Sequence, residues 1–308
     1  MNVLPSAPSA APVAAARAAF LWACRMDVAV RKPGNVSLAS AGHDMVAQQF
    51  LDSAAASAPA LFTPGSRVGA RVLGAVQATH AVAGCNTNLG ILLLCAPIAR
   101  ALEHCGAVAL TALRAALEQV LGALDVDDAR AAYAAIALAN PGGLGRSAEQ
   151  DVSGEVTVNL RAAMALAAER DFIARQYANG YVEVLQALER HFPAPLDDAA
   201  RRAAAAPQRV QQLFVDLLAR HPDSHIVRKH GEASARAVQA QAVTWRERLQ
   251  RRVSGVAEPD FEAGFAAWDE QLKQAALNPG TSADLTVCVL FLAAVLGRVS
   301  LSPAPAPA

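Results

Sequence analysis

The sequence predicts an all-α fold in a single domain. Hydrophobic residues make up 54% of the 308 residues, and many of them are alanine, the strongest helix former. Aromatic residues contribute only 5%, and segments rich in the β-branched and aromatic residues that favour strands are scarce. No change in composition marks a domain boundary. We therefore expect a bundle of about ten to twelve helices over residues 12–300, with flexible tails at 1–11 and 301–308 and with polar loops that converge on one pocket.

Helical periodicity, capping residues and Pro/Gly breaks divide the chain into helical segments. Pro12 and Pro207 each suit a first helical position, and Asp127 or Asp128 suits a helix cap. A loop is expected at 59–66, and the polar, aperiodic stretch 146–157 is the best candidate for a long functional loop. The expected helices cover 12–30, 44–57, 67–83, 91–102, 107–124, 127–139, 158–177, 180–191, 197–206 and 207–220, then a basic helix after Gly231 to 253, then 260–277 and 284–298.

The charges of the chain balance, with 27 basic and 27 acidic residues, so no global field attracts nucleic acid or a membrane surface. The first twelve residues lack the basic region and apolar block of a secretory signal. The two most apolar windows, 89–99 and 285–297, are shorter than the roughly 18–20 residues of a spanning helix. We expect a cytoplasmic protein without nucleic-acid or membrane partners, and the sequence leaves open whether it forms a homodimer.

Cysteine usage favours a reducing compartment. The count is odd, and no two cysteines form a C-x-x-C pair, so a disulfide framework or a zinc site is not expected. We interpret them as small apolar residues of the core. The five are Cys24, Cys85, Cys95, Cys105 and Cys288.

Polar turns at helix junctions are the recurring feature of the chain. They lie at 32–45, 84–90, 140–145, 221–231 and 278–284. Each of them alone is explained by helix capping. Together they carry more chemical variety than caps require, so we expect them to meet in one pocket. The variety consists of the carboxylates Asp44, Asp223 and Asp284, the cations Lys32, Arg228 and Lys229, and the histidines His43, His225 and His230.

These groups suit a nucleotide bound with magnesium. Carboxylates are hard oxygen ligands for Mg²⁺, which usually keeps one or two of them plus substrate phosphates. Cations beside glycine-rich helix starts bind phosphate groups, and histidines donate or accept protons near neutral pH. The alternatives are a cap for each carboxylate, a solvated helix end for Arg228 and Lys229, and ordinary hydrogen bonding for the histidines. No Walker-type loop, dinucleotide-binding glycine motif or serine nucleophile elbow is present.

In order along residues 25–295, these motifs resemble the triphosphoribosyl-dephospho-CoA synthase family. That family is all-helical, which agrees with the expectation from composition. The resemblance implies a transferase in which the 2′-hydroxyl of dephospho-CoA attacks C1 of the ATP ribose, adenine leaves, and the triphosphate is retained. The matching residues are Lys32-Pro33-Gly34, His43-Asp44-Met45, Phe50, Ser53, Gly84-x-Asn86-Thr87 with Gly90, Asp223 to Gly231, and Pro279-Gly280-x-Ser282-Ala283-Asp284-Leu285.

The resemblance also implies roles for individual residues, with ATP as substrate and Mg²⁺ as cofactor. Asp44 is assigned to base or metal duty, and His43 or His225 is the candidate acid. Metal ligation is expected from Asp223 and Asp284 together with Asp44. Contacts to phosphate, ribose or other parts of the substrates are expected from Lys32, Asn35, Asn86, Thr87, Asn88, Arg228, Lys229, Gly280 and Ser282.

Two departures indicate a divergent branch. Asn35-Val36-Ser37 stands where the synthases carry an apolar residue and then an acid, and Asn88-Leu89-Gly90 stands where they carry His-Lys-Gly. The branch is similar to members found with methanopterin-dependent one-carbon metabolism. One alternative is therefore a (phospho)ribosyl transferase for another acceptor in tetrahydromethanopterin or methanofuran cofactor biosynthesis. The other is a non-catalytic helical binding or scaffold protein.

Overall fold

The computed structural model describes residues 10–105, 108–139, 156–194, 197–200 and 207–301. Most of the two expected tails lies outside these residues, and so does most of the expected helix at 197–206. The turn at 140–145 and nearly all of the candidate loop at 146–157 also lie outside them.

The expected all-α fold is confirmed. Within the described residues only isolated bridges interrupt the helical pattern, Ser37 with Ser40 and Gly42 with Met45. The described ranges contain slightly more helices than the ten to twelve expected. The helices are α1 (Ala10–Ala29), α2 (Ala47–Leu61), α3 (Val68–Ala83), α4 (Leu89–Leu102), α5 (Leu110–Gly122), α6 (Val126–Ala139), α7 (Leu160–Ala167), α8 (Phe172–Asn179), α9 (Val182–His191), α11 (Pro207–Arg220), α12 (Ser224–Val253), α13 (Phe261–Gln274) and α14 (Gly280–Val295).

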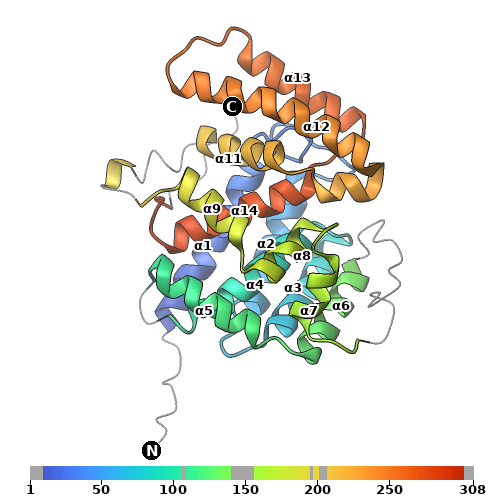
Figure 1. Ribbon diagram of the computed structural model, residues 1–308, viewed down its shortest axis with the longest axis vertical. Helices are drawn as coiled ribbons and strands as arrows, with labels where there is room; N and C mark the ends of the chain where they lie inside the picture. The colour runs from blue at the N-terminus through green and yellow to red at the C-terminus, as the bar shows by residue number, and fades with distance from the viewer. Residues whose placement is uncertain (1–9, 106–107, 140–155, 195–196, 201–206, 302–308) are drawn as a thin grey trace, which may run out of the picture.

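Two apolar clusters hold the bundle together. The larger cluster surrounds α4 and α14, the two most apolar windows of the sequence, and nearly every side chain of α14 is buried. The smaller cluster is rich in aromatic residues and joins α12 to α13, where the Trp245 and Trp268 rings stack with centroids 5.7 Å apart. Helices α11 and α14 contribute to both clusters, so the α12–α13 pair at one end in Figure 1 is continuous with the rest of the core.

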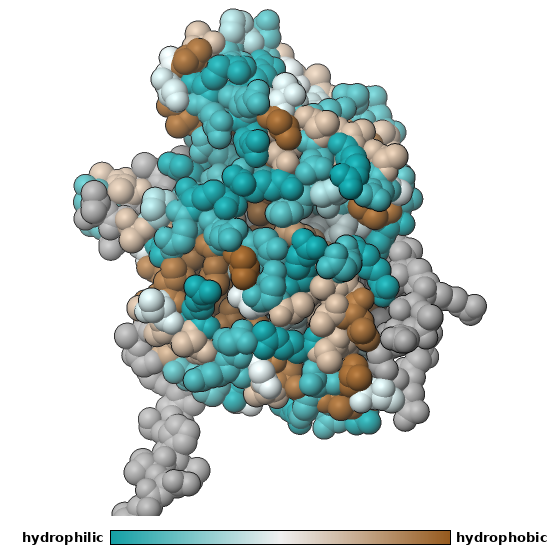
Figure 2. Space-filling view, viewed as in Figure 1, coloured by the Kyte–Doolittle hydropathy of each residue, from teal (hydrophilic) through white to brown (hydrophobic). Residues whose placement is uncertain are grey.

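The outer surface is polar over the α12–α13 end, where hydrophilic side chains cover most of the visible face in Figure 2. Apolar side chains are exposed there only in part, as expected for an arginine-rich helix that buries one face. In the part of the chain that the structure describes, no helix is long and apolar enough to cross a membrane.

Two helices begin before the positions expected from the sequence. The stretch 221–231 was expected to be a polar loop, but α12 starts within it at Ser224, with Asp223 as its N-cap. Gly231 then bends α12 with a positive φ of 81°. Similarly, α14 starts at Gly280 instead of residue 284. Both turns therefore place polar side chains in the first two turns of a helix, where their directions are fixed by the backbone.

Two other boundaries also differ. The helix expected over 158–177 is two helices, because Asp171 caps a new one by accepting hydrogen bonds from the N–H groups of Ile173 and Ala174, each at 2.9 Å. The helix expected from residue 44 begins later, at Ala47, because His43 and Asp44 both have positive φ, 57° and 61°. That conformation cannot continue into a right-handed helix.

Candidate active site

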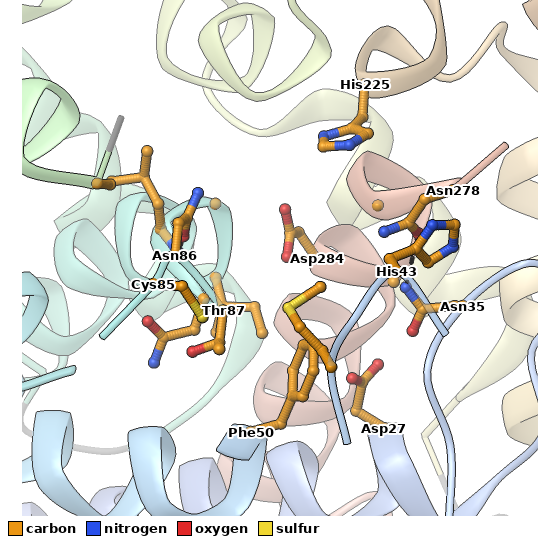
Figure 3. A pocket seen from close by; sticks show the side chains of 18 of the residues that line it. Asp27, Asn35, His43, Phe50, Cys85, Asn86, Thr87, His225, Asn278 and Asp284 are labelled. Carbon is orange, nitrogen blue, oxygen red and sulfur yellow. Dashed lines mark hydrogen bonds between the residues drawn. The ribbon is translucent and has the colours of Figure 1, made fainter. Parts of the chain in front are cut away.

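A cavity of about 470 Å³ opens where α4, α12 and α14 begin, and the loop after α1 forms another part of its wall. This volume suits a small-molecule site. Figure 3 shows side chains from these separate segments pointing into it. The predicted site residues that line it are Asn35, His43, Asn86, Thr87, Asn88, His225, Lys229, Gly280 and Asp284.

Lys32 lies beneath the cavity instead of in it. Its side chain is 0% exposed, and Nζ lies 3.0 Å from Oδ1 of Asp27 on α1. Nζ also donates to Oδ1 of Asn35 at 2.7 Å, and Nδ2 of Asn35 donates to Oδ1 of Asn278 at 3.0 Å. Lys32 therefore holds two side chains of the cavity wall, Asp27 and Asn35, and does not itself reach a ligand there.

The loop after α1 is fastened to α13. The N–H of Gly34 donates to Oδ1 of Asp269 at 2.8 Å, and Nζ of Lys273 donates to the backbone oxygen of Ser40 at 3.1 Å. Gly34 has a φ of 80°, and a Cβ there would lie 2.7 Å from the backbone oxygen of Leu277. Only glycine fits such a close approach, which explains the Lys-Pro-Gly turn physically.

His43 lies in the cavity wall, whereas Asp44 does not line the cavity. Nε2 of His43 is 2.8 Å from the carbonyl oxygen of Gly34, so this nitrogen carries a proton. In the neutral ring Nδ1 is then an acceptor. Asp44 is exposed at the surface of the same loop.

The turn before α4 contributes three polar side chains, all of which form hydrogen bonds within the protein. Asn86 caps α4 by accepting from the N–H of Leu89 at 3.0 Å, and its side chain borders the cavity. Thr87 donates to the hydroxyl of Ser53 at 2.7 Å, and Oδ1 of Asn88 accepts from Thr79 at 3.0 Å. Thr87 and Asn88 thus tie the start of α4 to α2 and α3.

Asp223 is fully engaged within the protein. Its Oδ1 accepts from the N–H groups of His225 and Ile226, at 2.9 and 3.2 Å. Its Oδ2 accepts from the N–H and the hydroxyl of Ser282, both at 2.8 Å. The carboxylate therefore joins the start of α12 to the start of α14, and it does not line the cavity.

Asp284 has the opposite environment. Its carboxylate lies in the cavity wall near the centre of Figure 3 and forms no hydrogen bond or ion pair with any described residue. A Cβ at Gly90 would lie 2.0 Å from its Oδ2, so α4 approaches this carboxyl group only because residue 90 is glycine. Burial, and then the negative charge of Asp27, raise the pKa of Asp284 well above its ordinary value.

The first turns of α12 place His225 and Lys229 in the cavity wall. Nε2 of His225 is buried without a hydrogen-bond partner among the described residues. Burial, together with the charges of Arg228 and Lys229, lowers the pKa of His225 to about 3, so the ring is neutral at physiological pH. Arg228 does not line the cavity, because its Nη1 pairs with Oδ2 of Asp171 at 2.7 Å.

The three predicted metal ligands do not meet. Asp44 is exposed in its loop and Asp223 is saturated by four donors, which leaves Asp284 alone in the cavity wall. In the described ranges, no group of three or more His, Cys, Asp and Glu side chains is arranged to hold a metal ion. The cysteines are all free, and Cys24, Cys95 and Cys288 are buried.

Sequence reasoning missed Asp27, the second carboxylate of the cavity. Asp27 is 4% exposed, and burial raises its pKa although Lys32 acts in the opposite direction. The available signal was a lone carboxylate in the last turns of an apolar helix, just before the Lys-Pro-Gly turn. Other lining residues that were not assigned to the site are Met45, Phe50, His80, Cys85, Leu138 and Asn278.

Comparison with known proteins identifies a matching family and a similar fold. A family model described as ATP:dephospho-CoA triphosphoribosyl transferase matches residues 13–302. A crystal structure from Archaeoglobus fulgidus, provisionally described as a triphosphoribosyl-dephospho-CoA synthase, has the same fold, with a TM-score of 0.61 and 24% identity over 79% of this chain and 97% of that chain. No curated protein matches the chain.

Proposed function

This chain belongs to the ATP:dephospho-CoA triphosphoribosyl transferase family, and we propose that the cavity at the start of α4, α12 and α14 is its active site. In the reaction of the family, the 2′-hydroxyl of dephospho-CoA replaces adenine at C1 of the ATP ribose. The observation that carries the proposal is the convergence of three helix starts and the loop after α1 on one cavity that contains a buried carboxyl group, Asp27, and a half-buried one, Asp284.

We propose a position for the triphosphate from the charges of the cavity. Lys229 is the one lysine or arginine among the described residues that line the cavity. The N–H groups of Gly90 and Ile91, in the first turn of α4, form no hydrogen bond with any described residue. Free N–H groups at a helix start, with the helix dipole behind them, bind phosphate groups. We therefore assign the triphosphate to the space between the start of α4 and Lys229.

In this proposal, Mg²⁺ binds to the protein together with ATP. One lysine and one helix start do not neutralise a triphosphate, and Mg²⁺ commonly keeps phosphate oxygens and water as most of its ligands. The described carboxylates form no metal cluster. We therefore propose MgATP as the substrate, with the ion held by phosphate oxygens, in place of a site formed by Asp44, Asp223 and Asp284.

The remaining polar groups divide into two kinds. Asn35, Asn278 and Asn86 present amides to the cavity, and we assign them to ribose and acceptor hydroxyl groups. The second kind acts indirectly by fixing the walls: Lys32, Thr87, Asn88, Asp223, Arg228 and Ser282 are engaged with other parts of the protein.

The test is adenine release. The purified protein is incubated with MgATP and dephospho-CoA, adenine is measured by chromatography, and the product mass shows whether the triphosphate is retained. Reactions without dephospho-CoA, or with ADP in place of ATP, are the controls. Absence of both adenine release and ATP binding by calorimetry would refute the proposal.

A variant pair tests the position of the triphosphate. Lys229→Met removes the cavity cation, so we expect the KM for ATP to rise about tenfold or more, the loss of one charge-assisted contact. Arg236→Met is the control, because Arg236 is exposed on the same helix and pairs with Glu232. An unchanged KM for Lys229→Met would contradict the placement. Nothing in the cavity favours a methanopterin or methanofuran precursor as acceptor, and the family membership argues against a scaffold.

A further inference from the structure

We propose that Asp284 and Asp27 divide the two proton transfers of the reaction: Asp284 protonates the departing adenine, and Asp27 accepts the proton of the attacking hydroxyl. Lys32 acts as a positioning residue that keeps Asp27 ionised. This inference rests on the proposed function and adds the residues that carry the chemistry.

The two carboxyl groups reach one cavity from different helices. Asp27 belongs to the last turns of α1 and Asp284 to the second turn of α14, and both side chains point into the cavity in Figure 3. Phe50 lies near them and adds an apolar surface. A nucleotide in the cavity is therefore within reach of two carboxyl groups.

Their surroundings differ in burial and in the presence of a cation: Asp27 is 4% exposed, whereas Asp284 is half-buried. Lys32 contacts Asp27 at 3.0 Å and is itself completely buried, so each of the two charges requires the other. The negative charges of Asp27, Asp223 and Asp171 add to the effect of burial in raising the pKa of Asp284. The charge of Arg228 acts in the opposite direction, and its guanidinium is paired with Asp171.

Charge therefore favours one proton on the pair, located on Asp284. Two carboxylates in one buried site do not ionise together easily. The pKa of Asp284 is raised well above its ordinary value by burial and by Asp27, whereas the ammonium of Lys32 opposes the rise at Asp27. A protonated Asp284 also avoids a further negative charge beside the triphosphate.

His225 does not supply the proton. Its pKa is lowered to about 3 by burial and by Arg228 and Lys229, so the ring has no proton to give as an acid at neutral pH. His43 holds its Nε2 proton on the carbonyl of Gly34. Of Asp284, His225 and His43, Asp284 is therefore the group whose environment favours a transferable proton.

The step balances. The bond between C1 of the ribose and the adenine nitrogen breaks, and its electron pair leaves with adenine, which takes the proton of Asp284. The bond between the acceptor oxygen and C1 forms, and the hydroxyl proton passes to Asp27. One carboxyl group is protonated before and after the step, and exchange of a proton between the two groups restores the starting state.

A substrate whose leaving group needs no proton distinguishes the acid role of Asp284 from the base role of Asp27. Asp284→Asn is expected to lower kcat for adenine release from ATP by about 10²–10⁴-fold, the usual contribution of an acid catalyst. With an N7-methylated purine nucleoside triphosphate, whose base departs without protonation, most of that loss should disappear. Asp27→Asn should lose activity with both substrates.

Three further variants test the roles of Asp27 and Lys32. Because Asp27→Asn leaves the ammonium of Lys32 buried alone, the double variant Asp27→Asn/Lys32→Met provides a second form without a base. Lys32→Met alone should move the acidic limb of the kcat/KM profile to higher pH. Asp52→Asn, an exposed change on α2, is the control with unchanged activity.

The outcomes are distinct. Equal losses of Asp284→Asn on both nucleotides would overturn the acid role, and a wild-type profile unchanged by Lys32→Met would overturn the base role. ¹³C NMR titration of the aspartate carboxyl groups gives a readout without turnover: Asp284 should be protonated and Asp27 ionised at pH 7. A wild-type protein that releases no adenine would refute the proposed function itself.

Discussion

Asp223 and Asp284 stand at the starts of neighbouring helices, come from the same kind of polar turn, and have opposite environments. Asp223 accepts four hydrogen bonds from three residues of the protein. Asp284 forms none with the described residues and faces the cavity. A carboxylate at a helix start is therefore structural when the chain saturates it and available for chemistry when the chain leaves it bare.

The different environments of Asp223 and Asp284 also affect the stability of the protein. A buried polar group without a partner lowers stability, and proteins accept this cost mainly at functional sites. The hydrogen bonds of Asp223 join α12 to α14 and so fix the position of the wall that carries Asp284. The saturated residue thus supports the unsaturated one, and variants of the two should behave in opposite ways.

The largest expected effect is on turnover. Asp284→Asn should raise the activation barrier by about 3–5 kcal/mol, which corresponds to the expected loss in kcat. The free energy of unfolding should not fall. With a raised pKa, the carboxyl group contributes stability that is fully present below its unfolded pKa and lost as pH rises through its folded pKa. Asparagine removes that loss. Urea denaturation at pH 8 checks this, and a clear destabilisation would contradict it.

Asp223→Ala should show the reverse pattern, with stability as the primary loss. Removal of four acceptor contacts at a buried helix cap should lower the free energy of unfolding by about 2–4 kcal/mol. Ser282→Ala is the matched control, because it removes one hydroxyl donor and keeps the backbone donor, so about 1 kcal/mol is expected. Denaturant titration measures both, and equal losses would argue against a four-donor cap.

Gly90 tests how closely α4 approaches Asp284. A methyl group there would overlap Oδ2 of Asp284, so Gly90→Ala should destabilise the fold by about 1–3 kcal/mol and lower kcat by displacing the carboxyl group. Gly122→Ala in α5 is the control: no atom lies within 4 Å of its Cβ, and a gain of about 0.4–1 kcal/mol is expected. A neutral Gly90→Ala would show that the helices move apart freely.

The smallest expected effect is a pH dependence due to His225. Its folded pKa of about 3 lies below the ordinary 6.5, so the unfolded chain binds more protons between these values. The contribution to stability is present above 6.5 and is lost as pH falls toward 3, with about 0.7 kcal/mol lost between pH 7 and pH 6. His225→Gln should remove this slope. An unchanged slope in the variant would mean that His225 is protonated in the folded protein.

Local sequence signals located several segments of the candidate site but did not show which of its carboxylates are engaged by the protein. They located the Lys-Pro-Gly turn and the turns before α4 and α14, because glycine, proline and capping residues act over a few positions. They did not distinguish Asp223 from Asp284. The distinguishing partner of Asp223 is Ser282, which lies 59 residues away.

Lys32 and Asp27 show the same limit. A lysine in a polar turn is normally solvated, so the sequence favoured a phosphate contact for Lys32. The folded chain instead buries it over the ring of Phe214, 5.9 Å from the ring centroid, and against Asp27. Asp27, in turn, lies within the helix expected over 12–30. Its place in the cavity wall depends on how α1 packs against α14.

The sequence by itself determined that this chain is helical, where its helices break, and which turns carry chemical groups. Backbone propensity, capping and periodicity are local, so a single sequence contains them. The tertiary structure decided which of those groups are saturated, which are buried beside a cation, and which face open space. These properties arise from contacts across long separations, such as the 235 residues between Gly34 and Asp269. The pKa and the availability of a carboxyl group depend on such contacts, so only the folded chain gave Asp223, Asp284 and Asp27 different environments.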